Sequence, residues 1–492
     1  MAKGELTKNR IYDVLIVGSG VAGMYAALQF PESTSVLLLC KYDKTTSNSN
    51  LAQGGVAAVL SFEDDSFERH IEDTLIAGGR ANNEQAVETL VTEGPDEVRN
   101  LIDNLGVEFD RNEKGELDKT LEGGHSRRRI VHHKDTTGAE LVRKLIVQVE
   151  GRKNIEQVEN CAVFNLANIR SGFRADIVSN GVVDSVFCSY CILCTGGIGR
   201  IYKYTTNPKS ATGDGIRVAY ELGAKIKDLH YIQFHPTAFN SDDGEQFLIS
   251  ESVRGEGAVL RNVNGERFMD RYDERLELAP RDVVSRSIIL ESRRTGSNKF
   301  YLDITHEDAD FVKNRFPGIF EGCMRYGVDM TKDLIPIFPC QHYLMGGIET
   351  DLDARTTVPR LYAAGECANT GVHGKNRLAS NSLLEALVFS KRAADDIKRC
   401  MNAGYPSVSP LPFTLETDGA PLPTGITEEI RSILQRAYFV FSDKDAVRSG
   451  RTRVNEILQR LNSGRFAVTT ELCETLSIAV CAGIILKEVD SE

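Results

Sequence analysis

The chain has 492 residues, of which 41% are hydrophobic and 26% are charged, and a formal net charge of −12. This length exceeds one ordinary domain, so we expect about three domains and a large core. The acidic balance argues against a general affinity for nucleic acid or for acidic membrane surfaces. Any attraction for an anionic ligand must therefore be local.

The opening MAKGELTKNR lacks the apolar centre of a signal peptide. The longest nearly apolar run, Leu476 to Leu486, falls short of the ~20 residues that a membrane-spanning helix needs. The 11 cysteines are odd in number, so they cannot form a complete disulfide framework, and their scatter suits a reducing compartment. We therefore expect a cytoplasmic protein without a membrane or nucleic-acid partner.

The spacing CxxCxxC at Cys188, Cys191 and Cys194 is compatible with a metal or iron–sulfur site. The surrounding SVFCSYCILCTGG, however, is typical of an apolar strand that leads into a glycine turn, and no fourth ligand follows at a useful spacing. Buried cysteine behaves as a small hydrophobic residue. We therefore expect no metal site.

A strand–turn–helix–strand pattern opens the chain. Ile11 to Val17 is a short apolar run, a helical pattern continues to Gln29, and a second strand is expected at Val36 to Cys40. The first turn has the GxGxxG spacing at Gly18, Gly20 and Gly23. Such a turn places a pyrophosphate on the helix N-terminus and is typical of dinucleotide binding. Lys41 stands where an acid that bonds the ribose is usual, so the ribose contact stays open.

The stretch from Leu121 to Arg129, LEGGHSRRR, combines three arginines with the carboxylate of Glu122. Arginines suggest a ligand with carboxylates or phosphates, which Glu122 should repel. Either Glu122 is a solvated partner of the arginines, since charge runs usually lie on a wet face, or the ligand carries positive as well as negative charge. The local sequence leaves both interpretations open.

A second nucleotide-facing element is expected far downstream. Val358 to Ala364 is typical of a strand, a Gly365-Glu366 turn follows, and a helix is expected from about Asn381. Two separated segments of one domain imply an insertion between them. After Cys400 a proline-rich run is typical of a linker, and helical periodicity extends from Thr427 to Glu488.

These patterns predict an α/β fold with a Rossmann-type domain. We expect this domain in residues 1–230 and 346–404, an inserted α+β capping domain in residues 231–345, and a linker with a helical domain in residues 405–492.

Nine segments occur together in the order GSGVAG, NLAQGGVAAV, EGGHSRRR, TGDGI, QFHPTAF, SESVRGEGAVL, LAPRDVVSR, HYLMGGIETD and GECANTGVHGKNRLASNSLLEAL. Over about Ile11 to Lys398 the chain thereby resembles the succinate dehydrogenase and fumarate reductase flavoprotein family, and within it the L-aspartate oxidase branch. The resemblance implies FAD rather than NAD. Because Asn48 stands where respiratory members commonly attach flavin through a histidine, we expect non-covalent FAD.

The resemblance also implies a set of residues around FAD. They lie on the phosphate turn, after the second strand, beside the flavin, and at the start of the expected Asn381 helix, whose dipole would stabilise an anionic reduced flavin. The expected cofactor residues are Ser19, Gly20, Val21, Ala22, Lys41, Asn48, Ser49, Asn50, Leu51, Ala52, Gln53, Gly54, Gly55, Cys161, Ala162, Asp214, Glu366, Ser382 and Leu383. Lys41 belongs to this set because L-aspartate oxidases carry lysine there.

For the substrate, the resemblance implies the holders His235, Ser250, His342 and Arg377. It also implies Arg281 as the proton donor or acceptor, with Glu251 and Arg254 as its relay. Oxidation of a small dicarboxylate needs cations for both carboxylates, a group for proton traffic and a dry site. Without the motif context, Arg281 would be a helix N-terminal residue paired with Asp282 or Glu277, and both histidines would be core or loop residues.

The resemblance implies oxidation of L-aspartate to iminoaspartate, with FAD reoxidised by O2 or fumarate. This is the first step of quinolinate and NAD synthesis, and quinolinate synthase consumes the imine. Glu122 is expected to pair with the substrate ammonium and to act in the catalytic site, rejecting succinate because a buried carboxylate would stay unpaired. The alternatives are a soluble fumarate reductase of the succinate dehydrogenase type and a catalytically silent flavoprotein.

Relatives usually carry an arginine-rich tail of the type RKESRGLHFRTDYP where this sequence has LKEVDSE. We therefore expect different contacts near the cap and the flavin domain at this end of the chain.

Overall fold

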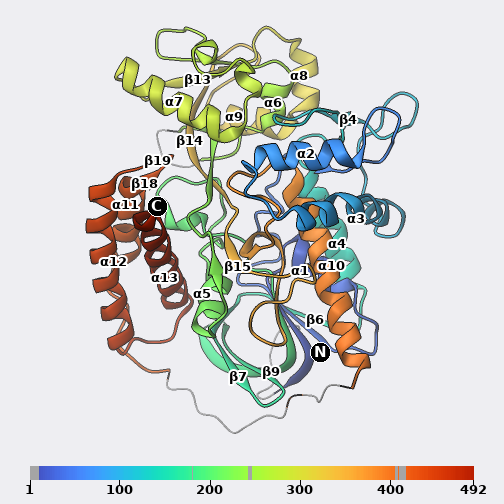
Figure 1. Cartoon of the computed structure of the whole chain (residues 1–492), viewed down its shortest axis with the longest axis vertical. Coiled ribbons are helices and arrows are strands. Elements are labelled where there is room, and N and C mark those ends of the chain that lie inside the picture. Colours follow the sequence, from blue (N-terminus) through green and yellow to red (C-terminus); the bar gives the residue numbers. More distant parts are fainter. Residues whose placement is uncertain (1–9, 180, 242–245, 405–407, 409–416) are drawn as a thin grey trace.

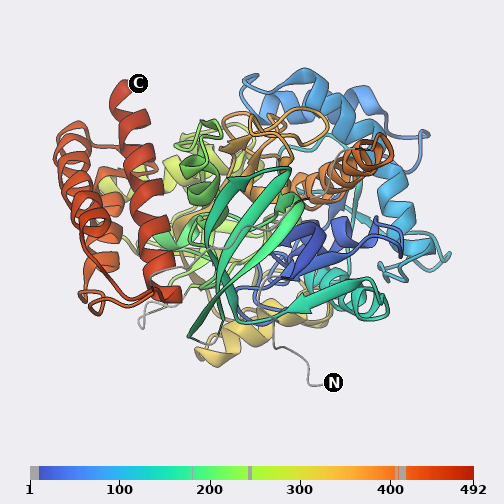
Figure 2. The same ribbon diagram turned by 90° about the horizontal axis from the view of Figure 1, so that it is seen from below.

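The computed structural model describes residues 10–179, 181–241, 246–404, 408 and 417–492. Most of the opening decapeptide and most of the expected proline-rich linker lie outside the described residues. Within the described part, no helix is long and apolar enough to cross a membrane. Figures 1 and 2 show a central sheet flanked by helices, a cap at one end of it and a helical bundle at its side.

The central sheet is parallel around β1. Its strands run in the order β6-β2-β1-β9-β8-β7, and β16 also pairs with β9. The strands are β1 Ile11–Val17, β2 Val36–Leu39, β6 Ile155–Val158, β7 Cys161–Ile169, β8 Gly172–Ser179, β9 Val182–Leu193 and β16 Leu361–Ala363. β9 pairs antiparallel with β8, and its second half pairs parallel with β1 and β16. The predicted opening unit is confirmed, and the distant strand β16 returns to the same sheet.

Both faces of this sheet are buried. Val14 and Ile16 of β1 pack in one core, and Leu15 and Val17 pack in the other. The helices of the first core are α1 Val21–Leu28, α3 Glu84–Asp103, α4 Thr137–Glu150 and α10 Asn381–Asn402. The second core contains α5 Asp214–Glu221 and the C-terminal helices. Because successive strand side chains point to opposite faces, the continuous apolar runs of these parallel strands require cover on both sides.

The cap has its own sheet, in the order β11-β14-β13-β12. Its elements are β11 Ile232–Phe239, α6 Glu251–Gly255, β12 Val259–Arg261, α7 Arg281–Thr295, β13 Phe300–Asp303, α8 Ala309–Arg315, α9 Pro317–Arg325 and β14 Ile335–Leu344. β11 and β14 connect the cap to the central domain, because Phe234 and Leu344 pack in the central core whereas Phe239 and Ile337 pack in the cap core. The two long strands are therefore shared by both assemblies.

Three helices form the C-terminal bundle: α11 Ile426–Ala437, α12 Lys444–Ser463 and α13 Thr470–Ser491. The prediction of a continuous helix is wrong from Tyr438 onward. There β18 Tyr438–Phe439 and β19 Phe441–Ser442 form a short hairpin. Val440 at its tip has a φ of 58°. The rings of Tyr438 and Phe439 pack edge-on against Phe234. This tertiary contact outweighs the local helical pattern.

Two small sheets position the loops that matter for the site. The sheet β3-β5-β4 joins β3 Val56–Ala57, β4 Lys119–Thr120 and β5 Ile130–Val131, and the sheet β10-β15-β17 joins β10 Ile226–Lys227, β15 Gly347–Glu349 and β17 Ala368–Asn369. The other elements are α2 Phe67–Ala77 and the 3-10 helices η1 Gly199–Ile201, η2 Met269–Arg271, η3 Leu276–Leu278 and η4 Gly365–Cys367. Since β3 follows NLAQGG and LEGGHSRRR connects β4 to β5, the first of these sheets brings both motifs together.

The three closely spaced cysteines serve as packing residues. Cys188 and Cys191 lie in one core of the sheet and Cys194 lies in the other, so their sulfur atoms do not converge. Burial raises the pKa of each of these thiols. They remain protonated, apolar side chains near neutral pH.

Candidate active site

The phosphate turn follows β1 directly. Gly18 has a φ of 112°, and a Cβ on it would lie 2.1 Å from the carbonyl oxygen of Cys194. A Cβ on Gly23 would lie 1.8 Å from the carbonyl oxygen of Gly18. The helix α1 begins at Val21, with Gly20 as a cap that contributes no side chain. The turn therefore leaves backbone N–H donors of the helix start accessible to an anion.

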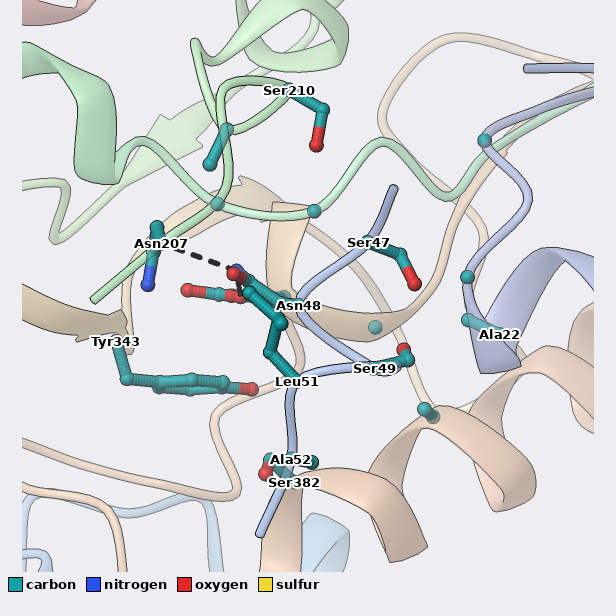
Figure 3. Close-up of a pocket in the computed structure, with 18 of the residues that line it drawn as sticks. Ala22, Ser47, Asn48, Ser49, Leu51, Ala52, Asn207, Ser210, Tyr343 and Ser382 are labelled. Atoms are coloured by element: carbon teal, nitrogen blue, oxygen red, sulfur yellow. Dashed lines mark hydrogen bonds between the residues drawn. The ribbon is translucent and has the colours of Figure 1, made fainter. Parts of the chain in front are cut away.

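One cavity extends from this turn to the start of α10. Its wall contains seventeen of the expected cofactor residues, namely Ser19, Gly20, Ala22, Lys41, Asn48, Ser49, Leu51, Ala52, Gln53, Gly54, Gly55, Cys161, Ala162, Asp214, Glu366, Ser382 and Leu383. Figure 3 shows the loop from Ser47 to Ala52 running through the cavity region between Ala22 and Tyr343. Sequence segments that are far apart thus form one continuous surface.

Two expected cofactor residues, Val21 and Asn50, do not line the cavity. The side chain of Val21 packs in the core, while its N–H donates to the Ser49 hydroxyl at 3.1 Å. The N–H of Asn50 donates to the Ser47 hydroxyl at 3.1 Å. Both residues shape the loop through their backbones.

Asn48 is engaged inside the protein. Its Nδ2 donates to Glu366 Oε2 at 2.8 Å and approaches Asn207 Oδ1 at 3.3 Å (Figure 3). Burial raises the pKa of Glu366 to about 7, against the opposing effect of the Asn48 amide. Asn48 therefore fixes a cavity-wall carboxyl whose charge changes near neutral pH.

The start of α10 forms the other end of the cavity. Ser380, which precedes the helix, adopts a φ of 61°. The side chain of Asn381 accepts from His70 Nε2 at 2.9 Å and donates to Thr74 at 3.1 Å. Burial and the nearby Arg129 lower the pKa of His70 to about 3, so its ring is neutral. This network, anchored in α2, fixes the positive end of a long helix dipole at the cavity.

Glu122 is 2% exposed and lines the cavity. Its Oε1 accepts from the Ser252 hydroxyl at 3.0 Å, and its Oε2 accepts from the Ser380 hydroxyl at 2.7 Å. The first interpretation of LEGGHSRRR, a solvated glutamate beside its arginines, is therefore wrong. The carboxylate turns into the cavity, where both of its recorded side-chain donors are neutral hydroxyls.

The arginines of this loop point elsewhere. Arg127 and Arg128 are exposed. Arg129 is 1% exposed and forms ion pairs with Asp65 at 2.8 Å and with Asp73 at 2.6 Å. None of these three arginines lines the cavity. Arg129 instead anchors the loop to α2 and so sets the direction of Glu122.

A buried charged chain starts at Arg281, the first residue of α7. Its Nε contacts Glu251 Oε2 at 2.6 Å, and Glu251 Oε1 contacts Arg254 Nη2 at 3.2 Å. Burial alone would raise the pKa of Glu251, but Arg281 and Arg254 lower it, whereas burial lowers the pKa of Arg254. Arg281 and Glu251 line the cavity, and Arg254 lies behind them.

Arg281 does not pair with Glu277 in the described structure. Glu277 pairs with Arg267 at 2.5 Å and accepts from the N–H of Leu260 at 3.1 Å. Arg281 Nη1 donates instead to Gln233 at 2.9 Å. Arg281 therefore faces the cavity although it is also a helix N-terminal residue.

Arg377 and His342 form the opposite wall. The guanidinium of Arg377 lies 4.1 Å from the ring centroid of Tyr343, and its Nη2 lies 3.2 Å from His342 Nε2. Burial and Arg281 lower the pKa of Arg377 to about 10, so it stays charged at neutral pH. Because arginine only donates, His342 accepts at Nε2 and donates from Nδ1 to Thr206 at 2.9 Å.

His235 lies behind His342, with ring centroids 4.9 Å apart, and it does not itself line the cavity. Burial and Arg281 lower the pKa of His235 well below its usual range. The N–H of Thr237 donates to its Nδ1 at 3.2 Å, so the ring proton is on Nε2. Among the described residues this Nε2 has no hydrogen-bond partner. A buried donor is thus left without an acceptor.

Ser250 caps α6 and lines the cavity. Its hydroxyl accepts from the N–H of Ser252 at 3.2 Å. Ser250, Glu251 and Ser252 therefore place three polar groups of one short helix beside Glu122 and Arg281.

Residues 13–383 match the family model described as an FAD binding domain. The chain is 48% identical over 391 residues to an L-aspartate oxidase from Clostridium perfringens, covering 79% of this chain and 87% of the relative. It is 38% identical over 499 residues to an L-aspartate oxidase from Pseudomonas aeruginosa, covering 97% of this chain and 92% of the relative. The chain belongs to the L-aspartate oxidase family.

The same architecture occurs among solved structures. A quinol fumarate reductase chain from E. coli (FrdA) matches with a TM-score of 0.89 at 27% identity, covering 99% of this chain and 90% of that chain. The expected α/β fold with an FAD-binding domain, a cap and a helical domain is confirmed.

FAD, the cofactor of this family, fits the donor set of the cavity. The start of α1 would offer its first-turn backbone and positive dipole end to a pyrophosphate, and the start of α10 would offer a positive dipole end to a flavin. A Cβ on Gly54 would lie 3.0 Å from Glu122 Oε1 and 3.3 Å from Ser380 Oγ. The loop that contains Gly54 therefore passes close to the carboxylate of Glu122. The residues at these two helix starts would hold FAD in this member of the L-aspartate oxidase family.

Sequence reasoning missed several residues of the cavity wall. All but one have small or polar side chains on loops, and the exception, Tyr343, lies in β14. The missed residues are Thr46, Ser47, Thr195, Gly196, Gly197, Asn207, Ser210, Tyr343 and Ser380. The run TGG after β9 carried a usable signal, because strand ends at the carboxyl edge of such a sheet gather around the ligand. Tyr343 and Asn207 carried none, since only the folded chain brings them to the cavity.

Arg129→Met is expected to lower the free energy of unfolding by about 3–5 kcal/mol, because it leaves Asp65 and Asp73 buried without a counter-ion. Urea unfolding of the apoprotein measures the change. Arg128→Met, one residue earlier and exposed, is the matched control and should stay within about 0.5 kcal/mol of the parent. Equal changes in both variants would show that the anchor does not stabilise the fold.

Proposed function

We propose that this protein oxidises L-aspartate to iminoaspartate at FAD. The observation that carries the proposal is the environment of Glu122. This buried carboxylate lines the cavity and is hydrogen-bonded by the hydroxyls of Ser252 and Ser380. A buried charge is costly without an opposite charge. The substrate ammonium would supply that charge, and succinate or fumarate would not.

The carboxylates of the substrate are proposed to lie against Arg377 and His342, with His235 directly behind His342. Arg377 carries the positive charge, and the unpartnered Nε2–H of His235 needs an acceptor. Ser250, in the same wall, adds a hydroxyl. Both histidines are neutral because burial and the arginines lower their pKa values. His342 accepts from Arg377 and donates to Thr206, so it positions that arginine, and the arginines neutralise the dianion.

Proton transfer is assigned to Arg281. It lies in the cavity wall with its charge stabilised by Glu251, which in turn contacts Arg254 behind it. Burial lowers the pKa of Arg254 at the inner end of this chain, while Glu251 opposes that effect. The chemistry that bound FAD would supply is acceptance of a hydride from the substrate carbon. The protein residues orient that carbon, exclude water and move the proton.

Electron acceptors and downstream chemistry extend the same proposal. The proposed electron acceptors are O2 and fumarate, and the dicarboxylate holders Arg377 and His342 would also bind fumarate. Iminoaspartate hydrolyses readily, so a quinolinate synthase that takes it up quickly is the fitting consumer in quinolinate and NAD synthesis. All 11 cysteines are unpaired and all but Cys400 are buried, which supports placing the protein in a reducing cytoplasm.

A substrate panel tests the function. Purified protein with FAD should release hydrogen peroxide with L-aspartate and not with D-aspartate or succinate. The D-isomer cannot direct its ammonium to Glu122 while it keeps both carboxylates and the reacting C–H in place. Fumarate reduction without aspartate turnover would select the soluble fumarate reductase. A yellow protein that turns over no dicarboxylate would overturn both enzymatic functions and favour the silent flavoprotein.

A further inference from the structure

The end of β2 contains an unusual buried lysine. Lys41 occupies the position where dinucleotide-binding folds commonly have an acid that bonds the ribose. Its Nζ donates to Thr212 Oγ1 at 2.6 Å and contacts Asp214 Oδ2 at 2.7 Å and Glu474 Oε1 at 2.8 Å. An ammonium group has three N–H donors, and these three oxygens use all of them. Lys41 therefore has no donor left for a ribose hydroxyl.

Asp214 offers a carboxylate beside Lys41. It is the first residue of α5 and lines the cavity together with Lys41 and Tyr42. Burial alone would raise the pKa of Asp214, but Lys41 lowers it, so the carboxylate is ionised. A carboxylate thus stands at the start of α5 instead of the end of β2, and Lys41 holds it in place.

The third partner, Glu474, comes from the C-terminal helix α13. Its Oε1 also accepts from the Tyr42 hydroxyl at 2.9 Å. Although burial alone would lower the pKa of Lys41, Asp214 and Glu474 raise it. The two carboxylates together keep the lysine charged in a buried position. Lys41 needs both of them, because one carboxylate leaves an ammonium donor without a charged acceptor.

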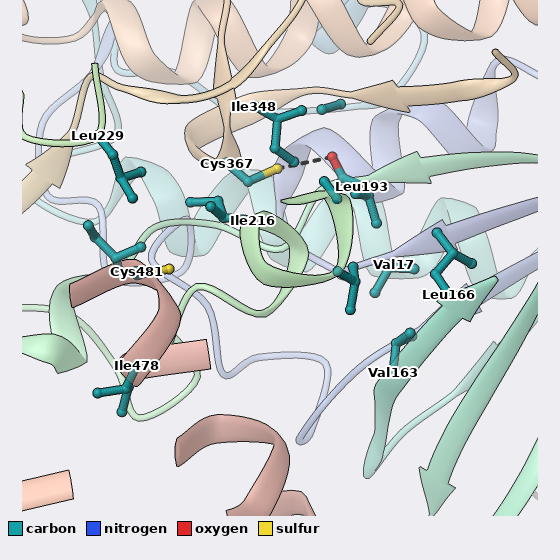
Figure 4. Close-up of a cluster of buried hydrophobic side chains, with 14 of the residues drawn as sticks. Val17, Val163, Leu166, Leu193, Ile216, Leu229, Ile348, Cys367, Ile478 and Cys481 are labelled. Carbon is teal, nitrogen blue, oxygen red and sulfur yellow. Dashed lines mark hydrogen bonds between the residues drawn. The ribbon is translucent and has the colours of Figure 1, made fainter. Parts of the chain in front are cut away.

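The helix that carries Glu474 is firmly seated. Ile478 and Cys481 of α13 pack in the same core as Ile216 of α5, as Figure 4 shows. The Nε of Arg217 donates to the Ser477 hydroxyl at 3.1 Å. Glu474 is therefore presented to Lys41 by a packed helix and not by a free side chain at the surface.

We infer that Glu474 is a positioning residue for the adenosine half of FAD, acting through Lys41 on Asp214. The C-terminal helical domain thereby completes the cofactor site of the central domain. This inference rests on FAD as the cofactor and does not depend on which dicarboxylate is oxidised.

Glu474→Gln tests it, with Glu471→Gln as the matched control on the exposed side of the same helix. Fluorescence titration of the apoprotein gives the Kd of FAD, and calorimetry gives the Kd of ADP, which carries the adenosine diphosphate without the flavin. Both Kd values should rise about tenfold in Glu474→Gln, the size typical of losing one partly exposed charged hydrogen bond. Both Kd values should stay at the parent values in Glu471→Gln, as should the melting temperature of the apoprotein and the kcat at saturating FAD.

A double-mutant cycle separates positioning from packing. In a Lys41→Met background, Glu474→Gln should weaken FAD and ADP binding no further, because its effect passes through the lysine. Unchanged affinities in the single variant would overturn the inference. So would a tenfold loss that persists without Lys41, or a loss for FAD that spares ADP. Aspartate turnover at saturating FAD reports the proposed function separately.

Discussion

Glu122→Gln is expected to reduce kcat/KM for L-aspartate by roughly 30- to 4,000-fold, which corresponds to about 2–5 kcal/mol for one partner of a buried charge pair. Fumarate reduction by the same variant should survive or improve. The reason is the position of Glu122 in the cavity wall, where its carboxylate is 2% exposed and faces two hydroxyl donors. Removing its charge removes the partner of the ammonium and also a repulsion toward purely anionic ligands.

Steady-state assays of aspartate oxidation and of fumarate reduction on one preparation measure both effects. Glutamine keeps the size of the side chain, so one serine hydroxyl retains an acceptor and the other can accept from the amide NH2. Glu113→Gln removes an exposed carboxylate from the preceding loop and should leave both rates unchanged. A parallel loss of the two activities would show that Glu122 does not recognise the amino group.

Arg281→Lys is expected to lower kcat by roughly 100- to 10,000-fold in both directions, the range that general acid–base catalysis supplies. Lysine keeps the charge but not the fork with which Arg281 reaches Glu251 at 2.6 Å and Gln233 at 2.9 Å. The KM for fumarate should change far less than kcat, because Arg377 and His342 still hold the carboxylates. Unlike Glu122→Gln, this variant should impair aspartate oxidation and fumarate reduction alike.

Arg286→Lys is the control, because Arg286 lies on the same helix and is exposed. The test compares kcat and KM for both substrates at saturating FAD, with the flavin spectrum as proof of cofactor loading. If Arg281→Lys keeps fumarate reduction within about threefold of the parent, the role of Arg281 in proton transfer is wrong, since general acid–base groups contribute at least about 100-fold.

The comparison of sequence and structure is most informative at LEGGHSRRR. The sequence predicted a choice for Glu122 between a wet surface and a ligand. It could not show that Arg129 pairs with Asp65 and Asp73, because these acids lie more than fifty positions earlier and are adjacent only after α2 packs on the loop. Arg127 and Arg128 precede it in the same run, but they are exposed whereas Arg129 is buried. Local charge patterns do not encode that difference.

The sequence also did not predict the depth of His235 and Arg254 relative to the cavity. Motif resemblance placed them near the substrate, but the structure sets both behind the cavity wall, in contact with His342 and Glu251. Which member of a polar group faces the ligand depends on the register of β11 against β14 and on the direction of the short helix α6. Both depend on cap packing.

The sequence by itself determined the elements whose signals are local. The apolar run of β1, the crowded glycines of the phosphate turn and the start of α10 at Asn381 follow from side-chain periodicity and from steric limits within a few residues. Only the tertiary structure decided the hairpin at Tyr438–Ser442, the direction of Glu122, and the contact of Tyr42 and Lys41 with Glu474, in which the tyrosine and the glutamate are 432 positions apart. Those features depend on which surfaces the whole chain buries together, and no local pattern carries that information.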